Sequence, residues 1–270
     1  MKMSSVTVTV VAVTGLLVPA YAQWNHPDQR ATRTPDGKPI LTAPAPRLNG
    51  KPDLSGIWKA PPSTLGPNRS GSGAVGADLS DIGDIHNNVF YEIKREEEPL
   101  KPEASAVVSK RRNETRPQAL CLPMGAPSFM MVRAFKIIQT PQQLVMFGET
   151  PDPPRQIYLD GRSLPKDPEP TWMGSSVGKW EGDTLVVQTT GFKEQGWLDN
   201  AGHPRSEQML MTERFHRRDF GHLDLEIRYE DPQYYTRPFT NKTTLNLIPD
   251  SDVIEYVCTE NEKDRAHTEK

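Results

Sequence analysis

The residues best suited to chemistry lie in one polar connection between runs of strand-forming residues. Trp197, Asp199 and His203 fall within seven residues of one another in the segment 192–206. A carboxylate and an imidazole can transfer protons, and an indole offers a flat apolar surface to a ring or a sugar. Because loops on a rigid scaffold often carry such groups, we expect a loop at the mouth of the domain. The structural alternative is a turn at 199–202, a tryptophan that plugs the end of the domain and a solvated histidine.

Glu213 is the second candidate, because it alternates with large apolar residues. On a strand it would share its face with Met209, Met211 and Phe215. A carboxylate buried there without a cation would have a raised pKa and could act as an acid or base, whereas an arginine partner would make a structural ion pair. Candidate partners are Arg133, Arg155 and Arg162. The inner face could instead be the opposite one, with Leu210, Thr212, Arg214 and His216.

These residues predict an acid–base site rather than covalent or cofactor chemistry. The expected catalytic residues are Glu213, His203 and Asp199, and the expected ligand-binding residues are Trp197, Tyr158 and Arg155. The chain has no Gly-x-Ser-x-Gly motif and no glycine-rich phosphate loop between a strand and a helix, so neither a serine nucleophile nor a nucleotide cofactor is expected. The six histidines show no paired metal-ligand spacing, and we expect no metal.

Short strands joined by tight turns must position these residues. The clearest hairpin spans 174–192, where Gly182 follows a turn and a β-branched run begins at Thr184. Further hairpins are expected over 135–147, 209–230 and 243–258, and a helix over 102–113. This pattern predicts an all-β fold with one or two short helices, in which an antiparallel meander of about 8–10 strands closes into a lipocalin-like barrel. A two-sheet sandwich is the alternative.

The remaining segments indicate an exported single-domain protein. Residues 1–22 have a lysine near the start, an apolar run and a small-residue cleavage site, as a signal peptide does; a membrane anchor would need a longer apolar run. An extended arm, expected to add little to the fold, occupies 23–51, the barrel domain 52–261 and a charged tail 262–270. We therefore expect a secreted or periplasmic protein with no membrane span after signal removal.

Charge and cysteine content narrow the possible partners. The net charge is −3, and removal of the signal, whose only charge is Lys2, leaves −4. Basic residues are scattered, which argues against nucleic acid as a partner. In an oxidising compartment Cys121 and Cys258 are expected to form a disulfide, with two buried thiols or a metal site as alternatives. The oligomeric state is not predicted.

Several motifs together resemble a large family of secreted bacterial β-rich proteins of uncharacterised function. They are Pro52–Trp58, Cys121-Leu-Pro, Arg155-Gln-Ile with Asp160-Gly-Arg162, Ser176–Val187, Trp197-Leu-Asp with Gly202-His-Pro204, Thr212–Phe215 and Glu255–Cys258. The resemblance spans roughly 52–261 and implies a lipocalin-like (calycin-type) barrel. It carries over no established catalytic residue.

Three functions fit these observations. The first is an exported barrel that binds a small apolar or aromatic molecule in its interior, with Trp197 and Tyr158 near the mouth. The second is a cofactor-free lyase, isomerase or hydrolase that uses Glu213, His203 and Asp199 on such a ligand. The third is a structural envelope module, which predicts an interior packed with side chains. Interior volume and the convergence of the three catalytic candidates distinguish these functions.

Overall fold

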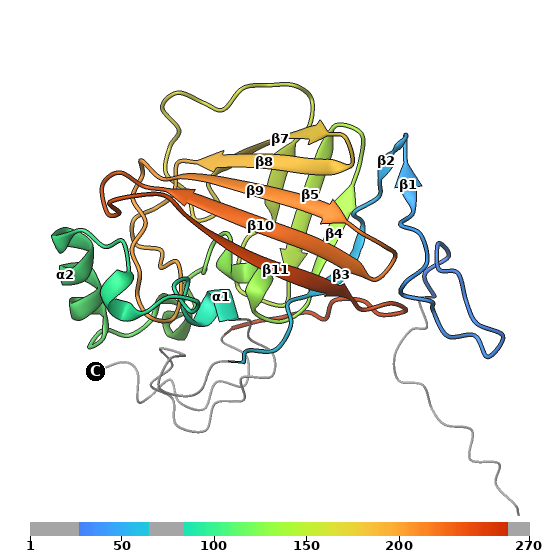
Figure 1. Ribbon diagram of the computed structural model, residues 1–270, viewed down its shortest axis with the longest axis horizontal. Helices are drawn as coiled ribbons and strands as arrows, with labels where there is room; N and C mark the ends of the chain where they lie inside the picture. Colours follow the sequence, from blue (N-terminus) through green and yellow to red (C-terminus); the bar gives the residue numbers. More distant parts are fainter. Residues whose placement is uncertain (1–26, 65–83, 259–270) are drawn as a thin grey trace, which may run out of the picture.

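Nine strands close into a barrel in the computed structural model, which describes residues 27–64 and 84–258 (Figure 1). The predicted signal peptide 1–22 and charged tail 262–270 lie outside the described residues. The barrel strands are β3 (Gly56–Lys59), β4 (Phe135–Gln139), β5 (Gln143–Gly148), β6 (Arg155–Tyr158), β7 (Ser175–Glu181), β8 (Thr184–Thr190), β9 (Leu210–Arg217), β10 (His222–Glu230) and β11 (Phe239–Leu247). The all-β barrel is confirmed, and the sandwich alternative is wrong.

Each strand pairs with its successor, and β11 closes the ring on β3. Strands in a ring of nine cannot alternate in direction at every step, so at least one neighbouring pair must be parallel. That pair is β6–β7, where Ile157 pairs with Ser176 and Tyr158 with Val177. The long crossing 159–174 returns the chain to start β7 in the same direction. This pair is the departure from the expected antiparallel meander.

Alternating positions of the strands fill the barrel interior. On β10, Leu223, Leu225, Ile227 and Tyr229 are at most 2% exposed. The 3-10 turn η4 (Ser128–Met131) adds three more fully covered side chains to the same core, Phe129, Met130 and Met131. Large core side chains therefore occupy the space in which we expected a ligand. This packing also explains why the short strands hold together, since each covered aliphatic or aromatic side chain contributes about 1.5–3 kcal/mol.

The predicted helix is present as α2 (Pro102–Arg111). It has proline at its first turn, and its backbone entry is fixed where Lys101 N–H donates to the carbonyl of Tyr234 at 2.9 Å. α2 therefore lies beside the β10–β11 connection, at one end of the barrel, with the single-turn helix α1 (Asp84–Asn87) nearby (Figure 1). The other short elements are the 3-10 turns η2 (Arg95–Glu97) and η3 (Pro117–Leu120). Among the described residues, no helix has both the length and the apolar character that crossing a membrane requires.

The predicted last hairpin is wrong in its second strand. β11 ends at Leu247, and residues 251–258 form no strand. The reason is that β3 already occupies the second edge of β11, where Asn246 pairs with Lys59 and Leu247 with Trp58. Residues 251–258 instead run along the outside of the barrel to the Cys121–Cys258 disulfide, which is confirmed.

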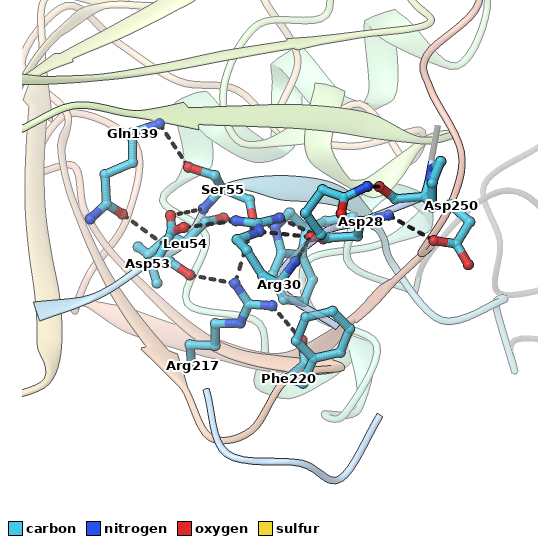
Figure 2. Close-up of polar contacts among 12 residues, drawn as sticks. Asp28, Arg30, Asp53, Leu54, Ser55, Gln139, Arg217, Phe220 and Asp250 are labelled. Atoms are coloured by element: carbon cyan, nitrogen blue, oxygen red, sulfur yellow. Dashed lines mark hydrogen bonds and ion pairs between the residues drawn. The ribbon is translucent and has the colours of Figure 1, made fainter. Parts of the chain in front are cut away.

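The N-terminal segment contacts the other end of the barrel, so the expectation that it adds little to the fold is revised. Figure 2 shows Arg30 between Asp28 and Asp53, with nitrogen–oxygen distances of 2.7 Å to each carboxylate. Arg217 of β9 donates to the carbonyls of Asp53 and Phe220. Burial lowers the pKa of Arg217 to about 10. This network fastens the segment to the barrel end, together with the small sheet of β1 (Arg47–Leu48) and β2 (Lys51–Pro52).

Candidate functional site

The predicted mouth loop folds tightly against α2. Within the loop, Leu198 N–H donates to the carbonyl of His203 at 2.9 Å, and Trp197 and Pro204 form an isolated β-bridge. Arg111, at the end of α2, donates to the loop carbonyls of Glu194 at 3.0 Å and Gly202 at 3.3 Å. The loop is therefore held as a fixed wall facing the helix.

Asp199 and His203 come together in this wall. Oδ2 of Asp199 lies 2.6 Å from Nδ1 of His203 and also accepts from Val89 N–H at 2.7 Å. Oδ1 accepts from the N–H groups of Gly202 and His203, at 3.0 and 3.1 Å. On the other side of the ring, Nε2 of His203 lies 3.6 Å from Oε2 of Glu98, beyond hydrogen-bond distance. The imidazole is thus fixed through Nδ1, and Nε2 is less constrained.

The charge of His203 follows from these two carboxylates. Burial by itself lowers the pKa of a histidine, but Asp199 and Glu98 outweigh that effect and raise the pKa of His203 to about 9. Near neutral pH the ring is therefore an imidazolium. It can donate a proton or hold an anion, but it is not available as a base.

His203 and Glu98 line a cleft of 760 Å³ between α2, residues 93–98 and the loop, called the α2 cleft below. Its basic side chains are Arg95, Arg111, Arg112 and Arg116, and its acidic ones are Glu96, Glu98 and Glu114. Two of the acids are engaged, since Glu114 pairs with Lys110 at 3.2 Å and Glu98 faces the imidazolium. Neither Arg95 nor Arg112 forms an ion pair within residues 27–64 and 84–258. The cleft therefore has an excess of positive charge.

Trp197 lines the same cleft but contributes little open surface. Its side chain is 6% exposed, and the guanidinium of Arg111 lies 5.1 Å from the centre of its ring. The flat face on which we expected a ring or sugar to stack is thus covered by a cation. In this position the ring of Trp197 mainly packs against the guanidinium of Arg111.

Glu213 is not brought to this site. It lies inside the barrel on β9 with no exposed surface, and both of its oxygens accept from the guanidinium of Arg155. The same guanidinium donates to Thr189 Oγ1 at 2.9 Å and lies 3.3 Å from Ser176 Oγ. Of the two alternatives for Glu213, this geometry is that of the structural ion pair. Arg155, expected to bind ligand, is fully buried in the same network.

Tyr158 lies in a separate groove of 820 Å³ beside the parallel strands β6 and β7. The crossing 159–174 forms one wall of this groove and contributes Trp172 and Arg162. Arg162 covers the ring of Tyr158 at 3.7 Å from its centre. The groove shares no lining residue with the α2 cleft, so Tyr158 and Trp197 do not contribute to one binding site.

Sequence reasoning did not identify Glu98, Arg95 or Arg112 as site residues. Basic residues at the end of a helix are favourable for the helix dipole, so their presence at the end of 102–113 does not by itself signal a binding site. Glu98 approaches His203 only through the fold, and no local pattern signals that contact. Among the residues that the structure describes, no group of three or more His, Cys, Asp and Glu side chains could hold a metal ion.

Comparison with family models, curated proteins and solved structures finds no match to this chain. The resemblance to a family of secreted bacterial proteins therefore stays a prediction, while the barrel itself is compatible with a lipocalin-like fold. Function has to be inferred from the geometry of the clefts.

Proposed function

We propose that this protein binds an organic anion, bearing carboxylate or phosphate groups, in the α2 cleft. The observation that carries the proposal is the excess of guanidinium groups, with Arg95 and Arg112 forming no ion pair to a described residue. Guanidinium groups bind carboxylates and phosphates through two parallel hydrogen bonds, which gives both energy and orientation.

The buried imidazolium supports the same ligand chemistry. Nε2–H of His203 faces the cleft beside Glu98, at a distance too long for a hydrogen bond, so an anion could accept from it. A volume of 760 Å³ lies within the range of about 300–1,000 Å³ that is common for small-molecule sites. An anion in the cleft would also offset the desolvation of Arg116, whose pKa burial lowers and Asp199 partly restores.

The proposal changes the place of binding that the sequence suggested. We expected a ligand inside the barrel, but core side chains occupy that interior, which is the packing that the structural envelope module predicts. A binding function therefore depends on the clefts outside the barrel. The proposal also changes the ligand, from the small apolar or aromatic molecule that we expected to an organic anion. The expected export is kept: we propose that binding takes place in the periplasm or outside the cell. The Cys121–Cys258 disulfide supports this location, because disulfides persist in oxidising compartments.

Calorimetric titration of the full-length mature protein tests the proposal. Citrate serves as a carboxylate probe, pyrophosphate as a phosphate probe and sorbitol as a neutral control. We expect at least one of the two anions to bind and sorbitol not to bind. Arg112→Glu should weaken anion binding at least about tenfold, which corresponds to 1.4 kcal/mol.

The matched control is Lys179→Glu, an exposed position on β7. It makes the same change in net charge as Arg112→Glu, so a general electrostatic effect would weaken binding equally in both variants. Equal weakening, or no binding of either anion to the wild type, would overturn the proposal.

A second function is favoured by the Asp199–His203–Glu98 arrangement. An imidazolium oriented by a carboxylate at Nδ1 can donate its Nε2 proton to a leaving group, and Glu98 is placed to accept a proton from the same substrate. The anion site would then be the substrate site of a cofactor-free lyase or hydrolase. If so, a cleaved or eliminated product should appear when a bound anion is incubated with wild type but not with His203→Gln. If the anion is recovered unchanged, catalysis is ruled out and binding is the function that remains.

A further inference from the structure

Another pocket, smaller than the α2 cleft, lies under the C-terminal segment 251–258, which is called the strap below. Its volume is 260 Å³, and His86, Gln118 and Tyr256 are among its lining residues. It adjoins the α2 cleft through Arg116 and Asn200, which line both, but most of its lining is different.

Three buried polar atoms in this lining have no hydrogen-bond partner among the described residues. They are Nδ1 of His86, whose side chain is 4% exposed, Oε1 of Gln118 and Oγ1 of Thr150. A buried polar atom left without a partner costs about 1–3 kcal/mol, so native proteins satisfy such atoms with water or a ligand. Their presence in one pocket indicates that the pocket takes up water or a ligand with hydrogen-bonding groups.

His86 is a neutral group in this environment. Burial lowers its pKa to about 4, although Asp199 acts in the opposite direction. A neutral imidazole has one nitrogen that donates and one that accepts, and the amide oxygen of Gln118 only accepts. A ligand that satisfies Gln118 must therefore carry an N–H or O–H donor.

The rest of the lining indicates the shape of the ligand and the place of its charge. Its one carboxylate, Glu149, is engaged by Ile254 N–H. Met124 and Val132 supply apolar surface, and Tyr256 supplies an aromatic ring. Arg133, at a left-handed φ of 66°, lies over the ring of Tyr256 at 5.4 Å and brings its cation to the pocket rim. A flat molecule fits between apolar walls, and an acidic substituent fits beside the arginine.

We infer that the strap pocket binds a small planar heteroaromatic molecule with an N–H donor and a carboxylate. The N–H groups meet Gln118 and His86, and the carboxylate meets Arg133 at the rim. The volume suits a ligand of one or two rings, since a cavity of about 150 Å³ holds benzene. This site is additional to the anion site of the α2 cleft and does not depend on it.

The strap closes the pocket through a small number of contacts. Ile254 N–H donates to Glu149 at 3.1 Å, Lys136 pairs with Asp252 at 2.8 Å, and the chain then reaches the disulfide at Cys258. Because residues 251–258 pair with no strand, the disulfide is the strongest of these attachments. The position of Tyr256 over the pocket thus depends on it.

Three probes separate the chemistry of the site in calorimetric titrations of the full-length mature protein. Orotate carries ring N–H groups and a carboxylate, benzoate carries the carboxylate alone, and uracil carries the N–H groups alone. We expect orotate to bind at least about tenfold more tightly than either of the others.

Gln118→Leu should weaken orotate binding at least about tenfold without lowering the melting temperature, because it removes an unsatisfied acceptor from the empty pocket. Gln208→Leu, at an exposed position, is the matched control and should leave binding unchanged. Should Gln118→Leu fail to fold, Tyr256→Ala gives the same test from the rim of the pocket. Citrate binding should respond to Arg112→Glu and orotate binding should not, which separates this site from the α2 cleft.

Three results would overturn the inference. One is that orotate fails to bind or binds equally well to wild type, Gln118→Leu and Tyr256→Ala. Another is a crystal structure, grown with orotate, in which only ordered water meets His86 and Gln118. The third is binding of benzoate as tight as that of orotate, which would contradict the role of the N–H donor.

Discussion

Replacement of Glu213 by glutamine tests how the barrel interior is held together. The carboxylate and the Arg155 guanidinium have no exposed surface, and both carboxylate oxygens are engaged by the same guanidinium. Glutamine keeps the shape of the side chain but removes its charge. The side chain at 213 then offers one acceptor in place of two to a guanidinium that still has no access to water.

The expected magnitude follows from that burial. Removal of one partner from a buried ion pair typically costs about 3–5 kcal/mol, because the other charge stays desolvated. In a domain of this size each 1 kcal/mol lowers the melting temperature by about 2–4 °C. Glu213→Gln should therefore melt about 6–20 °C below the wild type. The double variant Arg155→Met with Glu213→Leu should have a free energy of unfolding equal to that of the wild type or up to about 4 kcal/mol higher.

Urea unfolding followed by circular dichroism, with thermal melts in parallel, measures both variants. The folded fraction of Glu213→Gln should still bind citrate or pyrophosphate as the wild type does, because Glu213 does not line the α2 cleft. The reasoning is refuted if Glu213→Gln melts within about 2 °C of the wild type. It is also refuted if the double variant is as unstable as the single one.

Further predictions concern pH, the N-terminal segment and the disulfide. The pKa of His203 rises from 6.5 to about 9 on folding, so protonation of this residue stabilises the folded protein fully below pH 6.5 and no longer does so once the pH has risen through 9. The unfolding free energy of the wild type should therefore fall by about 3 kcal/mol over that range. The fall should be smaller in His203→Gln. Removal of residues 1–50 should lower the melting temperature by more than about 5 °C, since Asp53 and Asp250 at the barrel end lose their arginine partners, Arg30 and Arg33. Replacement of both Cys121 and Cys258 by serine, which opens a loop of 137 residues, should lower the unfolding free energy by about 5 kcal/mol in a denaturant titration.

The strands were predictable because their signals are local. Alternation along 222–230 and the glycine turn at Gly182 specify strand and hairpin without knowledge of the partner strands. The parallel pair β6–β7 was not predictable, since nothing local in the crossing 159–174 states the direction in which the chain returns. The final hairpin failed for a similar reason: a β-rich pattern over 253–258 does not reveal that β3 already fills the neighbouring edge.

In the candidate site, only the contact between residues close in sequence could be predicted. Asp199 and His203 lie four residues apart, so a short turn brings them together. Val89, which holds Asp199 through its N–H group, is 110 residues away from it. The partner of Glu213 posed the same difficulty, because Arg155 lies 58 residues from it and two other arginines were equally plausible. Long-range pairing of this kind depends on barrel closure, which no local pattern contains.

The proposed function places the anion in the α2 cleft. A crystal structure of the full-length mature protein tests this placement, determined at a concentration of pyrophosphate or citrate that saturates binding in calorimetry. We expect electron density for the anion in the cleft, within hydrogen-bond distance of Nε2 of His203 or of the guanidinium groups of Arg95, Arg112 or Arg116. Density for the saturating anion only elsewhere on the molecule, with the α2 cleft holding water alone, would contradict it.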